Sequence, residues 1–170
     1  RTTSCAQRIS LIVNAFKGNK YNPRRDKSRG FAEWCTNVSD ALVLDPELCQ
    51  VFETRCHPPD VSLVIATLLG SESDMTIDGA VKLADAAAAE YDQLSKELFL
   101  ILSQLIDLKS TYQEDDLLYI RSTFHRSSHR DGVGLLRWLE SFADTTGSKA
   151  QSELALSWSK FTIPAMPKVS

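Results

Sequence analysis

The sequence lacks the short motifs that mark the commonest catalytic and nucleotide-binding sites. It contains no G-x-S-x-G, H-E-x-x-H, Walker A loop or G-x-G-x-x-G, so hydrolase, metalloprotease and phosphate-cradling chemistry is not indicated. Its longest apolar run is far too short to cross a bilayer. We therefore expect a protein that is not an enzyme, holds no cofactor or metal, takes no small-molecule substrate and makes no contact with membranes.

Cysteine and histidine are scarce, and neither is spaced as a metal site requires. The cysteines form no C-x-x-C pair and are too few for a disulfide scaffold, which favours reduced thiols in an intracellular, cytoplasmic protein. His125 and His129 would share one face of a helix, but zinc normally recruits three or four ligands, so a basic loop is the favoured interpretation. Cys49, Cys56 and His57 could form a metal or nucleophile site, although ordinary core or surface thiols are favoured.

What the chain does contain is enough apolar and charged surface for one folded domain. Of its 170 residues, 43% are hydrophobic and 24% are charged, and the net charge of −3 argues against a wholly basic nucleic-acid binder. The charge is uneven, because six basic residues lie between 17 and 29, whereas seven acids and two lysines lie between 72 and 97. This distribution predicts a cationic flank and an anionic face.

The cationic flank is the candidate for contact with RNA. Basic side chains interspersed with a tyrosine suit phosphate contacts and the stacking of one base. A solvated loop without a ligand is the more common meaning of such a composition. The candidate RNA-contacting residues are Lys17, Lys20, Tyr21, Arg24, Arg25, Lys27 and Arg29.

The hydrophobic periodicity predicts an all-α, multi-helix bundle. Apolar residues recur at steps of three and four, and no alternating strand pattern flanked by hairpin turns is found. Asp45 before Pro46, Asp60 and Asp131 stand where helix N-caps are expected. The predicted helices cover 31–44, 46–57, 61–70, 81–105 (one helix, or two broken near 90–92), 114–124, 133–143 and 149–161, while 9–16 is helical or extended.

The helical pattern also predicts which side chains build the core. Large apolar residues at helical spacing pack inside by default. The expected core residues are Trp34, Leu98, Ile101, Leu105, Leu135, Trp138, Leu139 and Phe142.

Three segments carry a family resemblance through their order and spacing. Phe31–Leu42 (FAEWCTNVSDAL) opens with an aromatic-x-x-Trp step, and Ala89–Asp107 (AEYDQLSKELFLILSQLID) has a pattern of tyrosine and leucine positions. Asp131–Phe161 combines a small-residue turn, a Leu-x-x-Trp helix, a polar break and a leucine-bearing helix. Together they resemble the Gag capsid-like domain of LTR retrotransposons of the copia type.

The resemblance implies a non-enzymatic structural protein of two helical lobes that assembles with copies of itself into shells around RNA. It implies an N-terminal segment with the basic loop (1–30), lobes at 31–107 and 117–161 with a short linker between them, and a frayed tail (162–170). Trp34 and Trp138 would be lobe-core tryptophans. The zinc knuckle of the wider family is missing, and the homology motif of retroviral capsids cannot be placed.

Two other functions stay open at this point. A helical adaptor would bind a partner helix in an apolar groove lined by Leu98, Ile101 and Leu105. An enzyme would use Cys56 with His57, or the histidine pair at 125 and 129. The self-association expected for a capsid-like domain would instead pair the acidic region of one copy with the basic flank of another.

Overall fold

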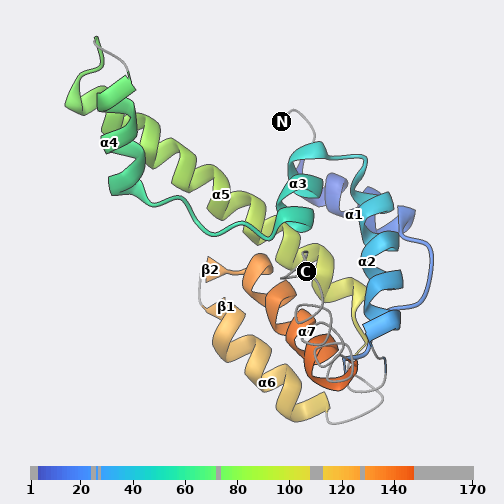
Figure 1. Cartoon of the computed structure of the whole chain (residues 1–170). Coiled ribbons are helices and arrows are strands. Elements are labelled where there is room, and N and C mark those ends of the chain that lie inside the picture. The colour runs from blue at the N-terminus through green and yellow to red at the C-terminus, as the bar shows by residue number, and fades with distance from the viewer. Residues whose placement is uncertain are drawn as a thin grey trace, which may run out of the picture.

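The computed structural model describes residues 4–23, 26, 28–71, 74–107, 113–126 and 129–147. Among these residues the all-α prediction is confirmed, with seven helices and one pair of two-residue antiparallel strands (Figure 1). The elements are α1 (Cys5–Ala15), α2 (Ser28–Leu42), α3 (Pro46–Thr54), α4 (Val61–Ser71), α5 (Ile77–Leu105), α6 (Gln113–Phe124), β1 (His125–Arg126), β2 (His129–Arg130) and α7 (Gly132–Gly147).

Three aspartates cap helices where the sequence places them. The Leu48 N–H donates to the Asp45 carboxylate at 3.3 Å, and the Gly134 N–H donates to that of Asp131 at 2.8 Å. Asp60 caps α4 in the same way, over 3.2 Å. Each bond satisfies an N–H that has no partner within the helix, so these three boundaries follow from local chemistry.

The structure decides the helix boundaries that the periodicity left open. α5 runs without a break through 90–92. Residues 9–15 belong to a helix that already begins at Cys5 behind a Ser4 cap, and Phe16 is its extended C-cap. The strand pair β1–β2 was not predicted, because two residues per strand are too few for a visible alternation. The predicted helix 149–161 and the tail 162–170 lie outside the described residues.

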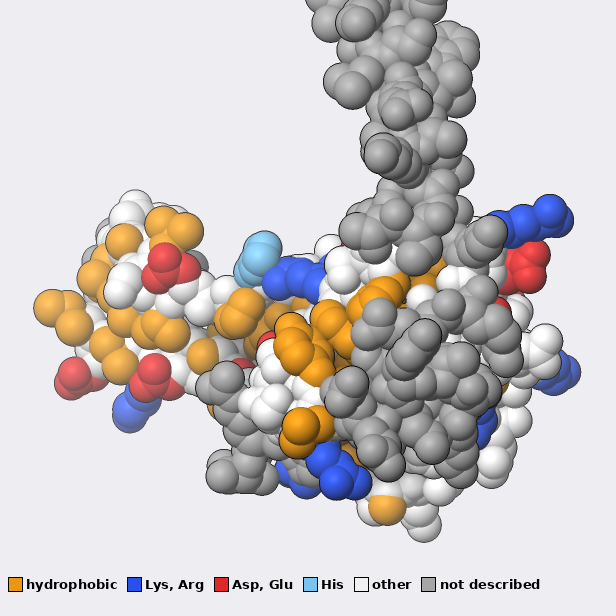
Figure 2. All heavy atoms as spheres, turned by 90° about the horizontal axis from the view of Figure 1, so that it is seen from below, with side chains coloured by type: hydrophobic (Ala, Val, Ile, Leu, Met, Phe, Trp, Pro, Cys, Tyr) orange, Lys and Arg blue, Asp and Glu red, His pale blue; other side chains and the backbone are white. Residues whose placement is uncertain are grey.

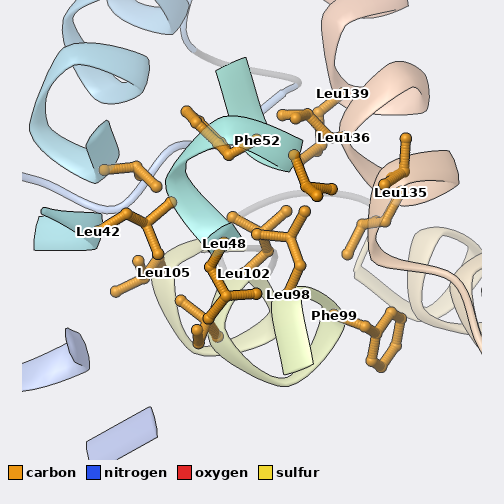
Figure 3. Close-up of a cluster of buried hydrophobic side chains, with 14 of the residues drawn as sticks. Leu42, Leu48, Phe52, Leu98, Phe99, Leu102, Leu105, Leu135, Leu136 and Leu139 are labelled. Atoms are coloured by element: carbon orange, nitrogen blue, oxygen red, sulfur yellow. The ribbon is translucent and has the colours of Figure 1, made fainter. Parts of the chain in front are cut away.

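One hydrophobic core surrounds the C-terminal half of α5 (Figure 3). The close-up shows leucines of α5 between side chains of α2 and α3 on one side and of α7 on the other. Leu98 and Leu135, which were assigned to different lobes, belong to the same cluster of buried residues. Within the described residues, the boundary expected near 108–116 is therefore not marked by a separation of cores.

Two of the predicted core residues lie only partly inside. Six are buried, as expected of core positions: Trp34, Leu98, Ile101, Leu105, Leu135 and Leu139. Trp138 and Phe142 are half-buried instead, and their prediction as core residues is corrected here. The Trp138 ring stacks on exposed Tyr119 of α6 at 5.3 Å and meets Phe142 edge-on at 4.9 Å, because both lie beside the leucine face of α7 and not on it.

Gly132 allows α7 to begin directly against the backbone of α5. A β-carbon at this position would lie 2.4 Å from both the Phe99 nitrogen and the Ser95 carbonyl oxygen. Because these are backbone atoms of a helix, no side chain can move aside. Ser95 also accepts a hydrogen bond from the Val133 N–H at 3.3 Å, so the crossing is held by polar contacts as well as by close packing.

We expect Gly132→Ala to destabilise the fold by about 1–3 kcal/mol, the usual cost of overpacking. Urea unfolding followed by circular dichroism measures the change. Gly70→Ala is the matched control, because nothing lies within 4 Å of a β-carbon built there. An unchanged midpoint for Gly132→Ala would show that α5 and α7 do not cross this closely.

Candidate interaction surface

α4 is an apolar helix with no buried residue. Six of its eleven residues are Val, Leu or Ile, and it packs closely only on α5 among the described elements. Figure 1 shows α4 and the N-terminal half of α5 side by side, projecting away from the other helices. We call α4 and residues 77–90 of α5 the arm. In α4, Leu63 and Leu69 are exposed, whereas four apolar residues are half-buried: Val61, Val64, Ile65 and Leu68. Apolar side chains exposed on one helix in this way are typical of interaction surfaces.

Two alanines of α5 are buried where the arm helices pack, and four large apolar residues of the arm are exposed. Ala80 and Ala84 of α5 are fully buried at 0% exposure, which lets α4 approach closely. The outward side chains are large and apolar, with exposed fractions from 38% to 68%: Leu63, Leu69, Ile77 and Leu83. Figure 2 shows apolar side chains gathered on the arm, with charged ones between them. The arm therefore carries a hydrophobic surface that the chain itself does not cover in the described structure.

The charges on and beside the arm are almost all negative. Among the described residues, six acids are exposed there, with one lysine, Lys82, among them: Asp60, Asp74, Asp78, Asp85, Glu90 and Asp92. Glu97, the last acid of the predicted anionic face, is instead fully buried and paired with Arg8 over 2.6 Å. The anionic face is thus shorter than predicted, because its last exposed acid is Asp92 and not Glu97.

The base of the arm is fastened to the core by a tyrosine. The Tyr91 hydroxyl donates to the Cys56 carbonyl at 2.7 Å, which ties α5 to the connector that precedes α4. Burial raises the pKa of Tyr91 to about 12, so its hydroxyl keeps the proton that it donates. This bond fixes where the arm leaves the core.

The predicted basic flank is only partly visible in the structure. Lys17 and Lys20 are exposed, and Arg29 forms an exposed ion pair with Glu33 at 3.4 Å. Arg24, Arg25 and Lys27 lie outside the described residues. Among the described residues of the flank, the two lysines directly after α1 are therefore the ones best placed to contact a phosphate or a carboxylate.

Tyr21 cannot act as the base-stacking residue that its sequence context predicted. Its side chain is 1% exposed and packs against Phe31 and Trp34, with ring centroids 5.2 and 5.5 Å away. Its backbone N–H donates to the Leu105 carbonyl and its own carbonyl accepts from Asp107. Tyr21 is therefore buried by contacts with the distant end of α5, although its neighbours in the sequence are polar. The local composition does not predict these contacts.

The buried Tyr21 hydroxyl predicts a loss of stability at alkaline pH. Burial, and secondarily the charge of Asp26, raises its pKa from its ordinary value of about 10 to about 12. Above pH 10 the unfolded chain releases this proton more easily than the folded one, so the free energy of unfolding falls as the pH rises toward 12. Urea unfolding between pH 7 and 11.5 measures this slope.

Tyr21→Phe is the matched variant for that measurement. The hydroxyl has no hydrogen-bond partner among the described residues, so its removal is expected to leave stability at pH 7 unchanged or raised. The variant should lose less stability than the wild type above pH 10, while Tyr91 still titrates in both. Identical slopes would contradict the burial of Tyr21.

The candidate metal and nucleophile residues do not converge. His125 and His129 lie in the strand pair and not on a helix, with Arg130 and Arg126 as their respective cross-strand partners. Cys56 and His57 are exposed, and burial raises the pKa of the half-buried Cys49 thiol. Cys35 is also half-buried, and burial raises its pKa to about 11. Within the described ranges, no three His, Cys, Asp or Glu side chains are placed to hold a metal ion.

The groove predicted for a partner helix is not open. Leu98, Ile101 and Leu105 are 0–2% exposed, because α1, α3 and α7 pack around the part of α5 that carries them. In addition, Trp34 of α2 donates to the Leu105 carbonyl. The prediction of a docking groove at these residues was wrong. The periodicity correctly indicates an apolar face, but the chain's own helices cover it, whereas α4 was not recognised as the surface left open.

Comparison with known protein families, with curated proteins and with solved structures finds no match for this chain. None of the helices in the described part of the chain is both long enough and apolar enough to span a membrane.

Proposed function

We propose that this chain is a structural, non-enzymatic domain that assembles with copies of itself, in the manner of a Gag capsid-like domain. One observation carries the proposal: a helix with six large aliphatic residues and no buried one stands on an arm outside the core. Leaving such a helix in water is costly, and contact with another protein surface relieves that cost. The ordered resemblance of three segments to Gag capsid-like domains supports a second copy as the partner.

Shell-forming domains need contacts that are individually weak and repeated. A stable pairwise interface usually buries about 800 Å² on each partner, and a smaller contact holds only when many copies cooperate. The short arm suits such a contact. Exposed acids on the arm and exposed lysines after α1 add an attraction that weakens as salt screens it. We propose that assembly occurs in the cytoplasm, around RNA.

Sedimentation velocity and negative-stain electron microscopy test the assembly. The purified chain is examined over a range of protein concentrations, at low and at high ionic strength. We expect species larger than a dimer that grow with concentration and shrink as the salt rises. A monodisperse monomer under every condition, including crowding, would overturn the proposal.

RNA binding is tested separately, because it rests on the basic flank and not on the arm. Fluorescence anisotropy of a labelled single-stranded RNA is compared for the wild type and for Lys17→Ala/Lys20→Ala. We expect the variant to bind more weakly and with a shallower salt dependence, since it releases fewer counterions. Lys82→Ala/Lys96→Ala is the control, because it removes the same charge outside the flank. Equal losses in both variants would speak against a specific role for residues 17–29.

The adaptor alternative places a foreign partner on the same arm. It predicts a stable monomer or dimer that keeps its apolar arm exposed and forms no higher assembly. The sedimentation experiment therefore separates the two functions.

A further inference from the structure

We propose that the arm of one copy docks head to tail onto the exposed face of α1 of a second copy, with the acids of the arm against Lys17 and Lys20. This inference rests on the proposed self-assembly and specifies its contact. The arm then binds one surface, the α1 face of another copy, and the contact has a direction.

The α1 face has the composition to receive a helix. Its exposed residues form an open, nearly flat stripe along one helix that contains no charge: Ala6, Gln7, Ser10, Leu11 and Asn14. Leu11 is 58% exposed, and the small residues beside it allow a helix to come close. Leucines of a partner can pack here without burying an ion, provided that the partner's charged side chains lie at the rim of the contact.

Charge complementarity points to the arm as that partner. The α1 face ends at two exposed lysines, Lys17 and Lys20, whereas the exposed charges on and beside the arm are acids apart from Lys82. Docking the outward leucines of the arm on Leu11 would bring opposite charges together at the rim of the contact. Pairing two arms with each other would instead bring acids against acids, which is unfavourable.

The two surfaces cannot meet within one molecule. Figure 1 shows the arm projecting from one side of the core and α1 lying on the other side. No close packing joins α4 to α1 among the described elements. Contact between them must therefore be made between copies, and each copy uses two different surfaces.

A contact between two different surfaces is heterologous, and it continues from copy to copy into a ring or an open chain. This geometry suits a repeating assembly better than a two-fold contact does, because a two-fold contact alone stops at a dimer. It also means that disabling either surface in every copy stops growth.

A mixing experiment tests the direction of the contact. The arm variant is Leu63→Asp/Leu83→Asp, and the α1 variant is Leu11→Asp/Lys17→Glu; all four positions are exposed, so both variants should fold. Val43→Asp/Leu44→Asp is the control, since these residues are 67% and 62% exposed but lie on neither surface. Circular dichroism melts confirm folding, and sedimentation velocity is run under conditions in which the wild type assembles.

We expect each variant alone to be a monomer and the control to assemble like the wild type. An equimolar mixture of the two variants should form a heterodimer and stop there, because it contains one intact arm and one intact α1 face in complementary copies. A mixture that stays monomeric would overturn the inference. So would dimers of the α1 variant alone, which would mean that arms pair with arms.

The same experiment separates this inference from the proposed function. Assembly of the wild type together with undiminished assembly of both variants would leave self-assembly standing and overturn the head-to-tail contact. A wild type that stays monomeric throughout would overturn both, and would leave the arm to a foreign protein.

Discussion

Replacing Trp34 with alanine is expected to lower the free energy of unfolding by about 3–5 kcal/mol, the usual cost of truncating a buried aromatic residue. Trp34 is 2% exposed and contacts the rings of Tyr21, Phe31 and Phe52. Its indole N–H also donates to the Leu105 carbonyl at 2.9 Å. The truncation therefore opens a cavity and leaves the carbonyl at the end of α5 without this donor.

Two further variants separate these contributions. Trp34→Phe keeps most of the apolar volume and removes the hydrogen bond, so it should cost less than the alanine variant. Trp138→Ala should also cost less, because that ring is half-buried beside α6. Urea unfolding of the three variants gives the order directly. A larger loss at Trp138 than at Trp34 would contradict the position of the core described above.

Replacing Arg8 with methionine is expected to cost about 3–5 kcal/mol, because it leaves a buried carboxylate without its charged partner. Glu97 is fully buried, and the Arg8 guanidinium donates to it at 2.6 Å. The Glu97 carboxylate also accepts a hydrogen bond from the Gln93 amide at 2.9 Å. Arg8 also lies 3.7 Å from the Asp45 carboxylate, so the change loosens α1 from both α3 and α5.

The double variant Arg8→Met/Glu97→Met distinguishes a lost ion pair from lost packing. Replacing both partners with apolar side chains of similar length removes the stranded charge, so most of the stability should return. Thermal and urea unfolding of the single and double variants form the cycle. If the double variant were as unstable as Arg8→Met, the loss would come from packing and not from the buried carboxylate. In that case the pair would not be what holds α1 in place.

Predictions that depend on residues close together in the sequence were confirmed more often than those that depend on distant residues. The caps at Asp45, Asp60 and Asp131 depend on atoms three residues away, and each was found. Tyr21 failed as a surface residue, because its burial depends on Phe31, Trp34 and the end of α5. The groove at Leu98 failed for the same reason: an apolar face is visible in the sequence, but what covers it is not.

The arm is the converse case, an apolar helix that the other helices leave exposed. The segment 61–70 was correctly predicted as an apolar helix, and nothing in its composition distinguishes it from a core helix. Its exposure follows from its position, since it packs on the alanine-rich half of α5 and the other helices gather around the leucine-rich half. The burial of Glu97 also could not be predicted from its acidic sequence neighbourhood, because it depends on the contact with Arg8.

Sequence alone establishes that this chain is helical, where most of its helices begin, and that its charge is divided between a basic and an acidic region. These properties arise from periodicity and from capping bonds that span three or four residues. The packing of the helices against one another is needed to tell which apolar faces are covered and which polar groups are buried. The reason is that the deciding contacts join distant residues: Trp34 and Leu105 lie 71 positions apart, and Arg8 and Glu97 lie 89 apart.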